Sequence, residues 1–334
     1  MTRSTILVIA ERVGVSPATV SRALNNLPGV STDKRSRIIA VAEELQYHPN
    51  VIARSLQGQR TNTVAYVADV SNRPAADLLF KDFITVLADR CARHGMDLLI
   101  HPATNGNANM GAIGRLLRSG RADGLIVADT LEHDQRLRYL IEQGLRFIAF
   151  GRSDIGADYP YVDVDGEWGI YTAVRHLIER GHRRIAFLGL PLDYAYAIHR
   201  RDGYLRALRE HGIPANPAHL IAGMTNETEA RLAMERLLAQ TEPPTAFVAA
   251  GDMLALYAMS VAAQRGLLAG RDYAITGFDD LPPAMHTTPP LTTMRQPFDQ
   301  ICDALIARLA RILAGDAEAH HVLLRPELII RGSS

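Results

Sequence analysis

The sequence predicts an N-terminal all-α helix-turn-helix domain followed by an α/β domain of two lobes, each built on a doubly wound parallel sheet. Three observations lead to this fold class. The first 60 residues contain short helical patterns and no strand-like run, whereas from Thr63 onward short β-rich runs alternate with amphipathic helical stretches. A chain of 334 residues is also too long for a single domain of about 100–200 residues.

The N-terminal domain is expected to span residues 1–49. Its first helical run is followed by GVS, and the next helix is expected to begin at Ser16 and Pro17. Ser16 has the side-chain acceptor favoured at an N-cap, and Pro17 falls at the first helical position, where a missing N–H costs nothing. Ala10, Val15 and Val20 are spaced to meet inside, so this segment predicts a helix-turn-helix motif.

A third helix is expected to run from Ser31 to Glu44. Five residues are predicted to lie on its inner side: Ile38, Ile39, Val41, Ala42 and Leu45. Ser31 and Lys34 also match the S-x-x-K pattern of acylases, but the position fits a helix start and no partner motif follows. We therefore interpret Ser31 as a cap and not as a nucleophile.

The α/β domain is expected to cover residues 61–334, after a linker at 50–60. Two sets of four strand-like runs flank YVDVD (161–165), which predicts two lobes with a cleft between them. Lobe 1 is placed at about 61–161 and 291–319, and lobe 2 at about 162–290 and 320–334. The runs are TVAYVADV, MDLLIHPA, DGLIVADT and RFIAFGR, then RRIAFLGL, HLIAGM, TAFVAAGD and YAITGFDD.

Charge and composition narrow the function. The first 60 residues carry eight basic and four acidic side chains, although the whole chain has no net charge. A basic head on an acidic body is expected of a module that meets phosphates. The start of the chain lacks a signal-peptide core, the longest apolar stretch is interrupted by Asp252, and Cys91 and Cys302 have no neighbours at metal-ligand spacing. We therefore expect a cytoplasmic protein without a membrane span or a metal site.

Several segments resemble the lactose-repressor (LacI/GalR) family of transcription regulators. In the first 67 residues these are VSPATVSRALNN (15–26), VSTDKRSRI (30–38), YHPNVIARSL (47–56) and RTNTVAYV (60–67). The resemblance extends over nearly the whole chain and implies a sequence-specific DNA-binding regulator that responds to a small molecule. In that family the second helix lies in the major groove of operator DNA.

Carried over residue by residue, the resemblance implies three base readers, Pro17, Ala18 and Arg22. Arg22 can donate two hydrogen bonds to guanine, and Ala18 can pack on a thymine methyl group. Phosphate contacts are implied for Ser16, Thr19, Ser21 and Asn25. The family's hinge helix matches PNVIARSLQG, which is too short to be stable alone. Here Asn50 is a possible cap, Leu56 matches the residue that wedges into the minor groove, and Ala53 lies one turn earlier.

The body also resembles the family's sensor domain, which is similar to periplasmic sugar-binding proteins. Ligands of open α/β sheets bind beyond the carboxyl ends of the strands, so residues that follow the strand runs are candidates. These candidate ligand-binding residues are Ser71, Asp77, Asp129, Arg152, Tyr194, Tyr196, Arg200, Gly251 and Asp279. Arg200 and Asp279 match ligand-binding positions of the family.

The candidate residues favour a sugar or polyol as the effector. Arginine donates a fork of hydrogen bonds and aspartate accepts two, which suits vicinal hydroxyls, and Tyr194 and Tyr196 could stack on the apolar face of a sugar. The chain departs from the family at Gly251, where an asparagine often binds ligand, and at Arg73, where aromatic residues are common. We expect an atypical, more open pocket.

Two further departures lie in the DNA-binding domain, where Val8 stands near a usually acidic position and Gln46 replaces a common helix-ending glycine. The resemblance implies a homodimer bound to double-stranded, pseudo-palindromic DNA, with release by a sugar inducer favoured. A purine or other corepressor is the alternative. We expect no cofactor and no catalysis, because phosphate loops and catalytic motifs are absent. A solute-binding transport protein would share the body, but it would need an export signal and would lack VSPATVSR.

Overall fold

The computed structural model describes residues 6–24, 28–45, 47, 60–68, 78–102, 110–316, 318 and 321–334. The chain divides into two compact units, Met1–Thr61 and Asn62–Ser334. The predicted hinge segment, apart from residue 60, lies outside the described residues. In the part of the chain that is described, no helix combines the length and the apolar character needed to cross a membrane.

Among its described residues, the first unit has the three predicted helices: α1 (Ile6–Val13), α2 (Pro17–Leu24) and α3 (Thr32–Glu44). Its core consists of two buried residues from each helix: Ile9, Ala10, Val20, Ala23, Ile38 and Ala42. The prediction that Ile39 faces inward is wrong, because α3 buries Ile38 and Ala42 on one stripe and leaves Ile39 39% exposed.

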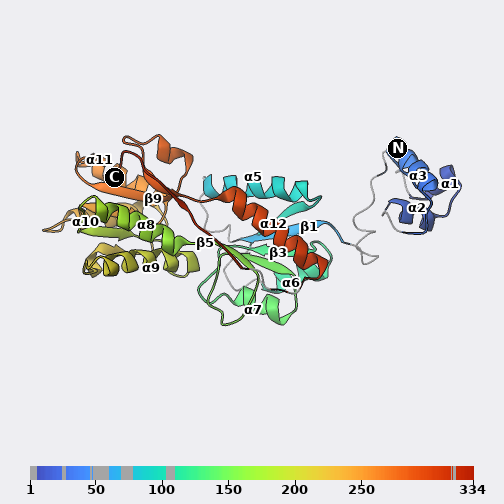
Figure 1. Ribbon diagram of the computed structural model, residues 1–334, viewed down its shortest axis with the longest axis horizontal. Coiled ribbons are helices and arrows are strands. Elements are labelled where there is room, and N and C mark those ends of the chain that lie inside the picture. The colour runs from blue at the N-terminus through green and yellow to red at the C-terminus, as the bar shows by residue number, and fades with distance from the viewer. Residues whose placement is uncertain are drawn as a thin grey trace. The chain divides into compact units, whose positions relative to one another are not determined.

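The second unit contains two six-stranded sheets, which confirms the predicted two-lobed α/β fold (Figure 1). The first sheet has the order β11-β5-β4-β3-β1-β2 and is parallel throughout. Its strands are β1 (Thr63–Ala68), β2 (Asp97–Pro102), β3 (Gly124–Val127), β4 (Phe147–Phe150), β5 (Tyr161–Val164) and β11 (His321–Leu324). Its helices are α5 (Leu78–Arg93), α6 (Met110–Arg118), α7 (Gln135–Glu142) and α12 (Phe298–Ala314).

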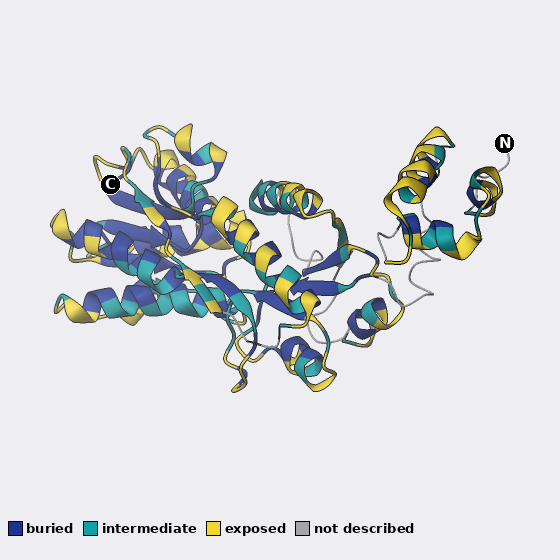
Figure 2. Ribbon diagram, turned by 45° about the vertical axis from the view of Figure 1, so that its right-hand side comes forward, coloured by how far each residue is buried: buried dark blue, intermediate teal, exposed yellow. Residues whose placement is uncertain are grey.

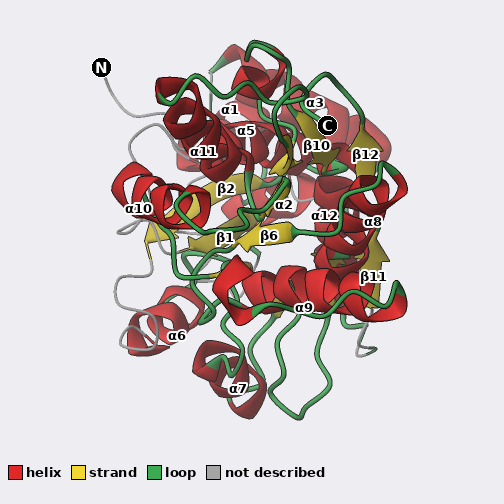
Figure 3. Ribbon diagram, turned by 90° about the vertical axis from the view of Figure 1, so that its left-hand side faces the viewer, coloured by secondary structure: helices red, strands yellow, loops and turns green. Residues whose placement is uncertain are grey.

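The second sheet has the order β12-β10-β9-β8-β6-β7 and is parallel except for the β10–β12 pair. Its strands are β6 (Ile185–Leu188), β7 (Leu220–Ile221), β8 (Ala246–Ala249), β9 (Ala274–Asp279), β10 (Thr292–Arg295) and β12 (Glu327–Ile329). The associated helices are α8 (Gly166–Glu179), α9 (Ala195–Glu210), α10 (Glu227–Leu238) and α11 (Asp252–Gln264), with short 3₁₀ turns at Pro217–His219 and Pro282–Met285. Figure 3 shows α9 and α8 beside this part of the molecule.

The predicted crossover points between the lobes need correction. All eight predicted runs form strands, but the chain completes a fifth strand, β5, in the first sheet before it leaves that lobe. β10 joins the second sheet and β11 returns to the first, so residues 162–164, 291–295 and 321–324 belong to the opposite lobe from the one predicted. The sequence pattern identifies short strands, but the choice of sheet depends on which neighbour each strand pairs with.

The burial of residues follows the three-layer arrangement expected of parallel sheets with helices on both faces. Figure 2 shows strands that are largely buried and helices whose outer faces are exposed. β3, β6 and β8 are buried at every residue, as expected for parallel strands covered on both faces. The predicted ligand-binding residues lie at the carboxyl ends of such strands and in the loops that follow them.

Helices α8 and α9 approach each other closely at Gly203. A Cβ atom added there would lie 2.2 Å from the carbonyl oxygen of Glu167. We therefore expect Gly203→Ala to force the helices apart and lower the free energy of unfolding by about 2 kcal/mol, measured by urea denaturation. Gly111→Ala on α6 is the control, because its Cβ would meet only the flexible end of Arg115, at 3.3 Å. Equal stability of the two variants would contradict this view of the α8–α9 contact.

Candidate DNA-binding and effector-binding sites

The start of α2 is built as predicted. The Thr19 amide donates to Ser16 Oγ at 3.2 Å, and the two hydroxyl groups lie 2.8 Å apart. Gly14, with φ +77°, ends α1 and turns the chain toward this cap. Because both ends of the turn are fixed by local hydrogen bonds, the orientation of α2 within the first unit is well defined.

The opposite face of α2 is available for contact. Val20 and Ala23 are buried in the core, whereas Pro17, Ala18 and Arg22 are exposed and Thr19 and Ser21 are half-buried. Ser16, at the cap, is also exposed. This arrangement suits the predicted DNA contacts, which remain predictions. Asn25, Asn50, Ala53 and Leu56 lie outside the described residues.

In lobe 2, Arg200 and Asp279 come together at the carboxyl edge of the sheet. Arg200 Nη2 lies 3.6 Å from Asp279 Oδ1, and Nη1 donates to the carbonyl oxygen of Ala250. The guanidinium stacks on the ring of Phe278, with Cζ 3.7 Å from the centroid. Gln296 Nε2 donates to the same Asp279 oxygen at 2.6 Å. The pair is therefore preorganised, with both side chains about nine-tenths buried.

The backbone that carries Asp279 is held by Asp252, which sequence reasoning did not single out for this role. Its buried carboxylate accepts from Leu281 N at 2.7 Å and from Thr293 Oγ1 at 2.5 Å. Burial raises the pKa of Asp252 to about 6. Asp279 itself has φ +122°, a conformation rare for residues other than glycine. Asp252 thus stabilises an unusual turn that points Asp279 toward Arg200.

Gly251 adjoins the Arg200–Asp279 pair. A Cβ atom added to it would lie 3.7 Å from Asp279 Oδ2, so glycine leaves space beside the carboxylate. A larger side chain at this position would contact Asp279 directly. The structure is therefore consistent with the predicted opening at Gly251.

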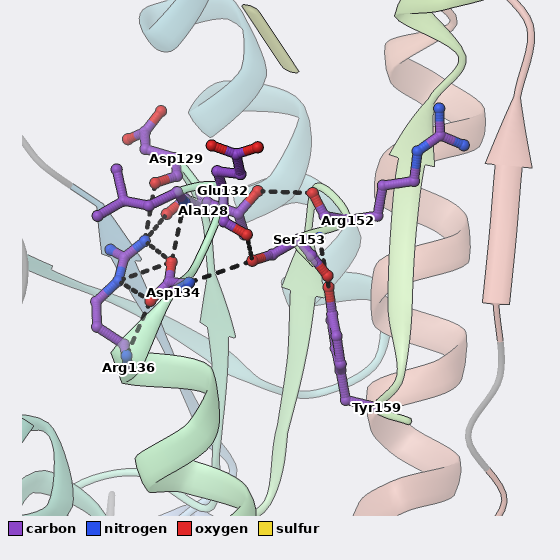
Figure 4. Close-up of polar contacts among 10 residues, drawn as sticks. Ala128, Asp129, Glu132, Asp134, Arg136, Arg152, Ser153 and Tyr159 are labelled. Carbon is purple, nitrogen blue, oxygen red and sulfur yellow. Dashed lines mark hydrogen bonds and ion pairs between the residues drawn. The ribbon is translucent and has the colours of Figure 1, made fainter. Parts of the chain in front are cut away.

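In lobe 1, a buried ion pair positions Asp129 after β3. Arg136 and Asp134 are 2% and 0% exposed and lie 2.6 Å apart, and Arg136 Nη2 donates to the carbonyl oxygens of Ala128 and Asp129 (Figure 4). Asp129 adopts φ +51°, and its carboxylate points away from Arg136 in Figure 4. This network fixes the backbone at the end of β3, while the Asp129 side chain points away from Arg136.

Arg152 is positioned by the loop after β4. Ser153 Oγ donates to the carbonyl oxygen of Glu132 at 2.9 Å, and the Tyr159 hydroxyl bonds the Ser153 backbone. Arg152 extends away from these contacts (Figure 4), with Nε 3.3 Å from Asp163 Oδ2. The predicted ligand-binding residue is therefore already paired with an aspartate.

The two lobes meet along a short backbone contact. Ala195 N donates to the carbonyl oxygen of Thr130 at 2.9 Å, and Glu132 N donates to that of Asp193 at 3.1 Å. These bonds join the loop after β3 to the start of α9. We call the region around this contact the lobe junction. It includes the predicted ligand-binding residues Asp129, Arg152, Tyr194, Tyr196 and Arg200.

Tyr194 and Tyr196 stack on each other at the lobe junction, with centroids 5.3 Å apart. Both are half-buried, and the Arg200 guanidinium lies 5.3 Å from the Tyr196 ring. One face of each ring is therefore already covered by the other ring, and the stacking of a sugar on these tyrosines stays a prediction. Ser71 and Asp77 lie outside the described residues.

Sequence reasoning missed Asp163 and His199, which meet across the lobe junction. Asp163 lies on β5 and His199 on α9, with His199 Nδ1 4.0 Å from Asp163 Oδ2. An acidic residue within the apolar run YVDV was the available signal, but the run was interpreted as a separator and not as a strand. His199 adjoins Arg200, yet a lone histidine on a helix carries little information.

Burial shifts the pKa values of this pair in opposite directions. Desolvation raises the pKa of Asp163 to about 6, against the attraction of Arg152, and it lowers the pKa of His199 to about 4, with Arg152 adding to the effect. Asp165, Asp202 and Arg200 are the other charged groups that act on His199. At neutral pH the aspartate is ionised and the imidazole is neutral.

These shifts predict opposite effects of acid on stability. Acidification from pH 6.5 to 4.5 stabilises the fold through Asp163, whose folded pKa is raised, and destabilises it through His199, whose folded pKa is lowered. Relative to wild type, Asp163→Asn should therefore lose more stability on acidification, by about 2 kcal/mol over this pH range, and His199→Phe should lose less. Urea unfolding at both pH values measures this. If the free energy of unfolding of either variant differed from that of wild type by the same amount at both pH values, this prediction would be contradicted.

Two surface cavities lie outside the lobe junction. One of 680 Å³ is lined by residues including Arg183, Ile213 and Glu242, at the amino ends of β6 and β8. Another of 480 Å³ lies beside α7. Since ligands of open α/β sheets bind at the carboxyl ends of strands, we do not assign the effector to either cavity.

A helix-turn-helix unit followed by a two-lobed α/β unit of this kind defines a ligand-sensing transcription regulator. Residues 5–50 match the model of the lacI family of bacterial regulatory proteins, and residues 174–334 match a periplasmic binding protein-like domain. The HTH-type transcriptional regulator AglR of Rhizobium meliloti is 32% identical, over 98% of this chain and 93% of that protein. The chain belongs to the lacI family of regulatory proteins.

Solved structures agree with this assignment. The lac repressor dimer bound to operator and the anti-inducer ONPF is 26% identical, with a TM-score of 0.86 over 99% of both chains. The transcriptional regulator CelR in complex with cellobiose is 28% identical, with a TM-score of 0.76 over 99% of this chain and 100% of that one. Both similarities include the N-terminal unit as well as the sensor.

Proposed function

We propose that this protein is a repressor of carbohydrate-utilisation genes that binds operator DNA as a homodimer in the cytoplasm and is released by a neutral sugar. The observation that carries the proposal is the Arg200–Asp279 pair, fixed at the carboxyl edge of lobe 2 in a chain that also has an exposed α2 face. The first feature suits hydroxyl groups and the second suits the major groove.

The charges at the lobe junction support a neutral effector. Both arginines that were predicted to bind ligand at the lobe junction already face an aspartate: Arg152 faces Asp163 and Asp165, and Arg200 faces Asp279. An anionic ligand would have to displace one of these pairs, whereas a polyol can hydrogen-bond to them as they are. The complex of the relative CelR with cellobiose supports the same class of effector.

The helix-turn-helix unit and the regulator relatives support a binding function without catalysis. The sensor domain converts ligand binding into a change in DNA affinity only if the sugar binds the DNA-free state more tightly than the DNA-bound state. A two-fold homodimer would present two copies of α2 to the two half-sites of a pseudo-palindrome.

Selection of bound fragments from a genomic DNA pool tests the DNA-binding part of the proposal. We expect enrichment of one pseudo-palindromic motif at physiological salt, with half-sites spaced by whole turns of the double helix. Weak, strongly salt-dependent retention of all fragments alike would contradict it, because that behaviour reflects phosphate contacts without base reading.

A further inference from the structure

Two buried polar atoms face each other across the lobe junction without a hydrogen bond. Asp163 Oδ2 and His199 Nδ1 both lack a hydrogen-bond partner, and the Asp163 side chain is only 6% exposed. The other Asp163 oxygen already accepts from the amide of Val164 at 2.8 Å. Buried polar atoms are usually hydrogen-bonded, so each of these two atoms can take one further hydrogen bond.

The spacing of the two atoms fits a single oxygen between them. At 4.0 Å they are too far apart for a direct hydrogen bond, but each can lie about 2.8 Å from one intervening hydroxyl group. A neutral imidazole can donate from Nδ1 while the carboxylate accepts, so the oxygen that fits must both accept and donate a proton. A hydroxyl group does both, as a water molecule does, so a sugar hydroxyl can take the place that water would otherwise fill.

The surroundings argue against other occupants. Arg152 Nε lies 3.3 Å from Asp163 Oδ2, and Arg152 Nη2 lies 3.9 Å from Asp165 Oδ1, so its charge is already balanced and an anion would meet two carboxylates. Within the described ranges no group of three or more side chains suited to a metal ion exists. A neutral hydroxyl group therefore fits the local charge best.

The pair also spans the two lobes. Asp163 belongs to β5 of the first sheet, and His199 lies on α9, which packs in the second lobe next to Arg200. A group held by both side chains would therefore stabilise the arrangement of the lobes in which Thr130 and Ala195 are hydrogen-bonded. Recognition of that group would be linked directly to the relative position of the lobes.

We propose that Asp163 and His199 form a subsite that binds one hydroxyl group of the neutral sugar effector and makes closure of the lobes depend on it. The subsite rests on the proposed function, because it assumes a hydroxylated effector. It is separate from the Arg200–Asp279 pair and determines which hydroxyl pattern the sensor accepts.

The test combines protein variants with ligand analogues. Calorimetric titration at pH 7.5 against D-glucose, D-galactose, cellobiose, maltose, sucrose and trehalose identifies a binding sugar, and its monodeoxy analogues are then measured. Wild type should bind one analogue about 10- to 100-fold more weakly than the parent, because that analogue lacks the hydroxyl group that this subsite binds. In Asp163→Asn and in His199→Phe that ratio should fall to about threefold or less, while the ratios for the other analogues stay unchanged.

His211→Phe is the matched control, because His211 caps the C-terminal end of the same helix and its Nδ1 contacts only the carbonyl oxygen of Ala207 among the bonds described. It should keep the wild-type ratios. Two substitutions are used so that poor folding of one leaves the other informative, and unfolding midpoints verify each protein.

Equal weakening of the parent and all deoxy analogues in both variants would overturn the subsite and reduce the pair to a structural contact. If no sugar of the panel binds wild type, the subsite is also overturned, because it requires such a ligand. Enrichment of an operator from the genomic pool would then still support a DNA-binding regulator, so the two failures are distinguishable.

Discussion

Replacing Arg200 with methionine is expected to weaken effector binding at least about 100-fold while leaving operator affinity in the absence of sugar unchanged. Methionine keeps an apolar chain over Phe278 but removes the fork of donors that faces Asp279. Removing one member of a buried charge pair at a binding site leaves the other charge uncompensated and typically costs about 2–5 kcal/mol, the middle of which exceeds 100-fold in affinity. Calorimetric titration of the sugar and anisotropy titration of the operator measure the two affinities separately.

Arg201→Met provides the control for this prediction. Arg201 neighbours Arg200 on α9 but pairs with Asp202, whose side chain is 44% exposed, so its loss removes the same charge without touching Asp279. If both variants weakened sugar binding equally, the general charge of α9 would be responsible, and Arg200 would lose its assigned role.

Replacing Arg22 with alanine is expected to lower specific operator affinity by about 100-fold. A bidentate contact to guanine contributes about 1–3 kcal/mol of discrimination, and a homodimer would lose two of them. Arg22 is exposed on the side of α2 opposite to Val20 and Ala23, where such a contact is sterically free. Anisotropy titrations against the operator and a scrambled duplex at fixed salt give the specificity ratio.

Arg12→Ala removes an equal charge from the same unit and serves as the control. Arg12 lies on α1 and forms a surface ion pair with Glu44 at 3.0 Å. Its loss should change affinity for both duplexes by a similar small factor. A specificity ratio that survived Arg22→Ala would show that Arg22 contacts phosphate or solvent and does not read a base.

The parts of the fold that could be predicted are those fixed by local chemistry. Ser16 and Pro17 determine the start of α2 through capping, and eight short β-rich runs form strands because parallel strands between helix layers must be apolar. The lobe boundaries could not be predicted to the residue, because β5 and β10 are assigned to a sheet by pairing with strands far away in the sequence.

The candidate site was predicted unevenly for a similar reason. Arg200 and Asp279 follow from the family motif and meet as expected. The pairing of Asp163 with His199 depends on how the two lobes meet, which strand periodicity does not encode. The mutual stacking of Tyr194 and Tyr196 depends on their side-chain orientations at the start of α9, which the sequence pattern does not encode either. Asp252 acts through buried hydrogen bonds to a distant turn, and no local pattern identifies such a role.

Release of a selected operator by sugar tests the central claim most directly. Fluorescence anisotropy would follow a labelled operator, obtained from the genomic pool, at fixed salt while the panel sugars are added one at a time to the wild-type protein. The account predicts that one neutral sugar lowers operator affinity and that Arg200→Met removes this response. Operator binding that ignores every sugar and strengthens on addition of a purine would contradict the inducer account and indicate a corepressed regulator.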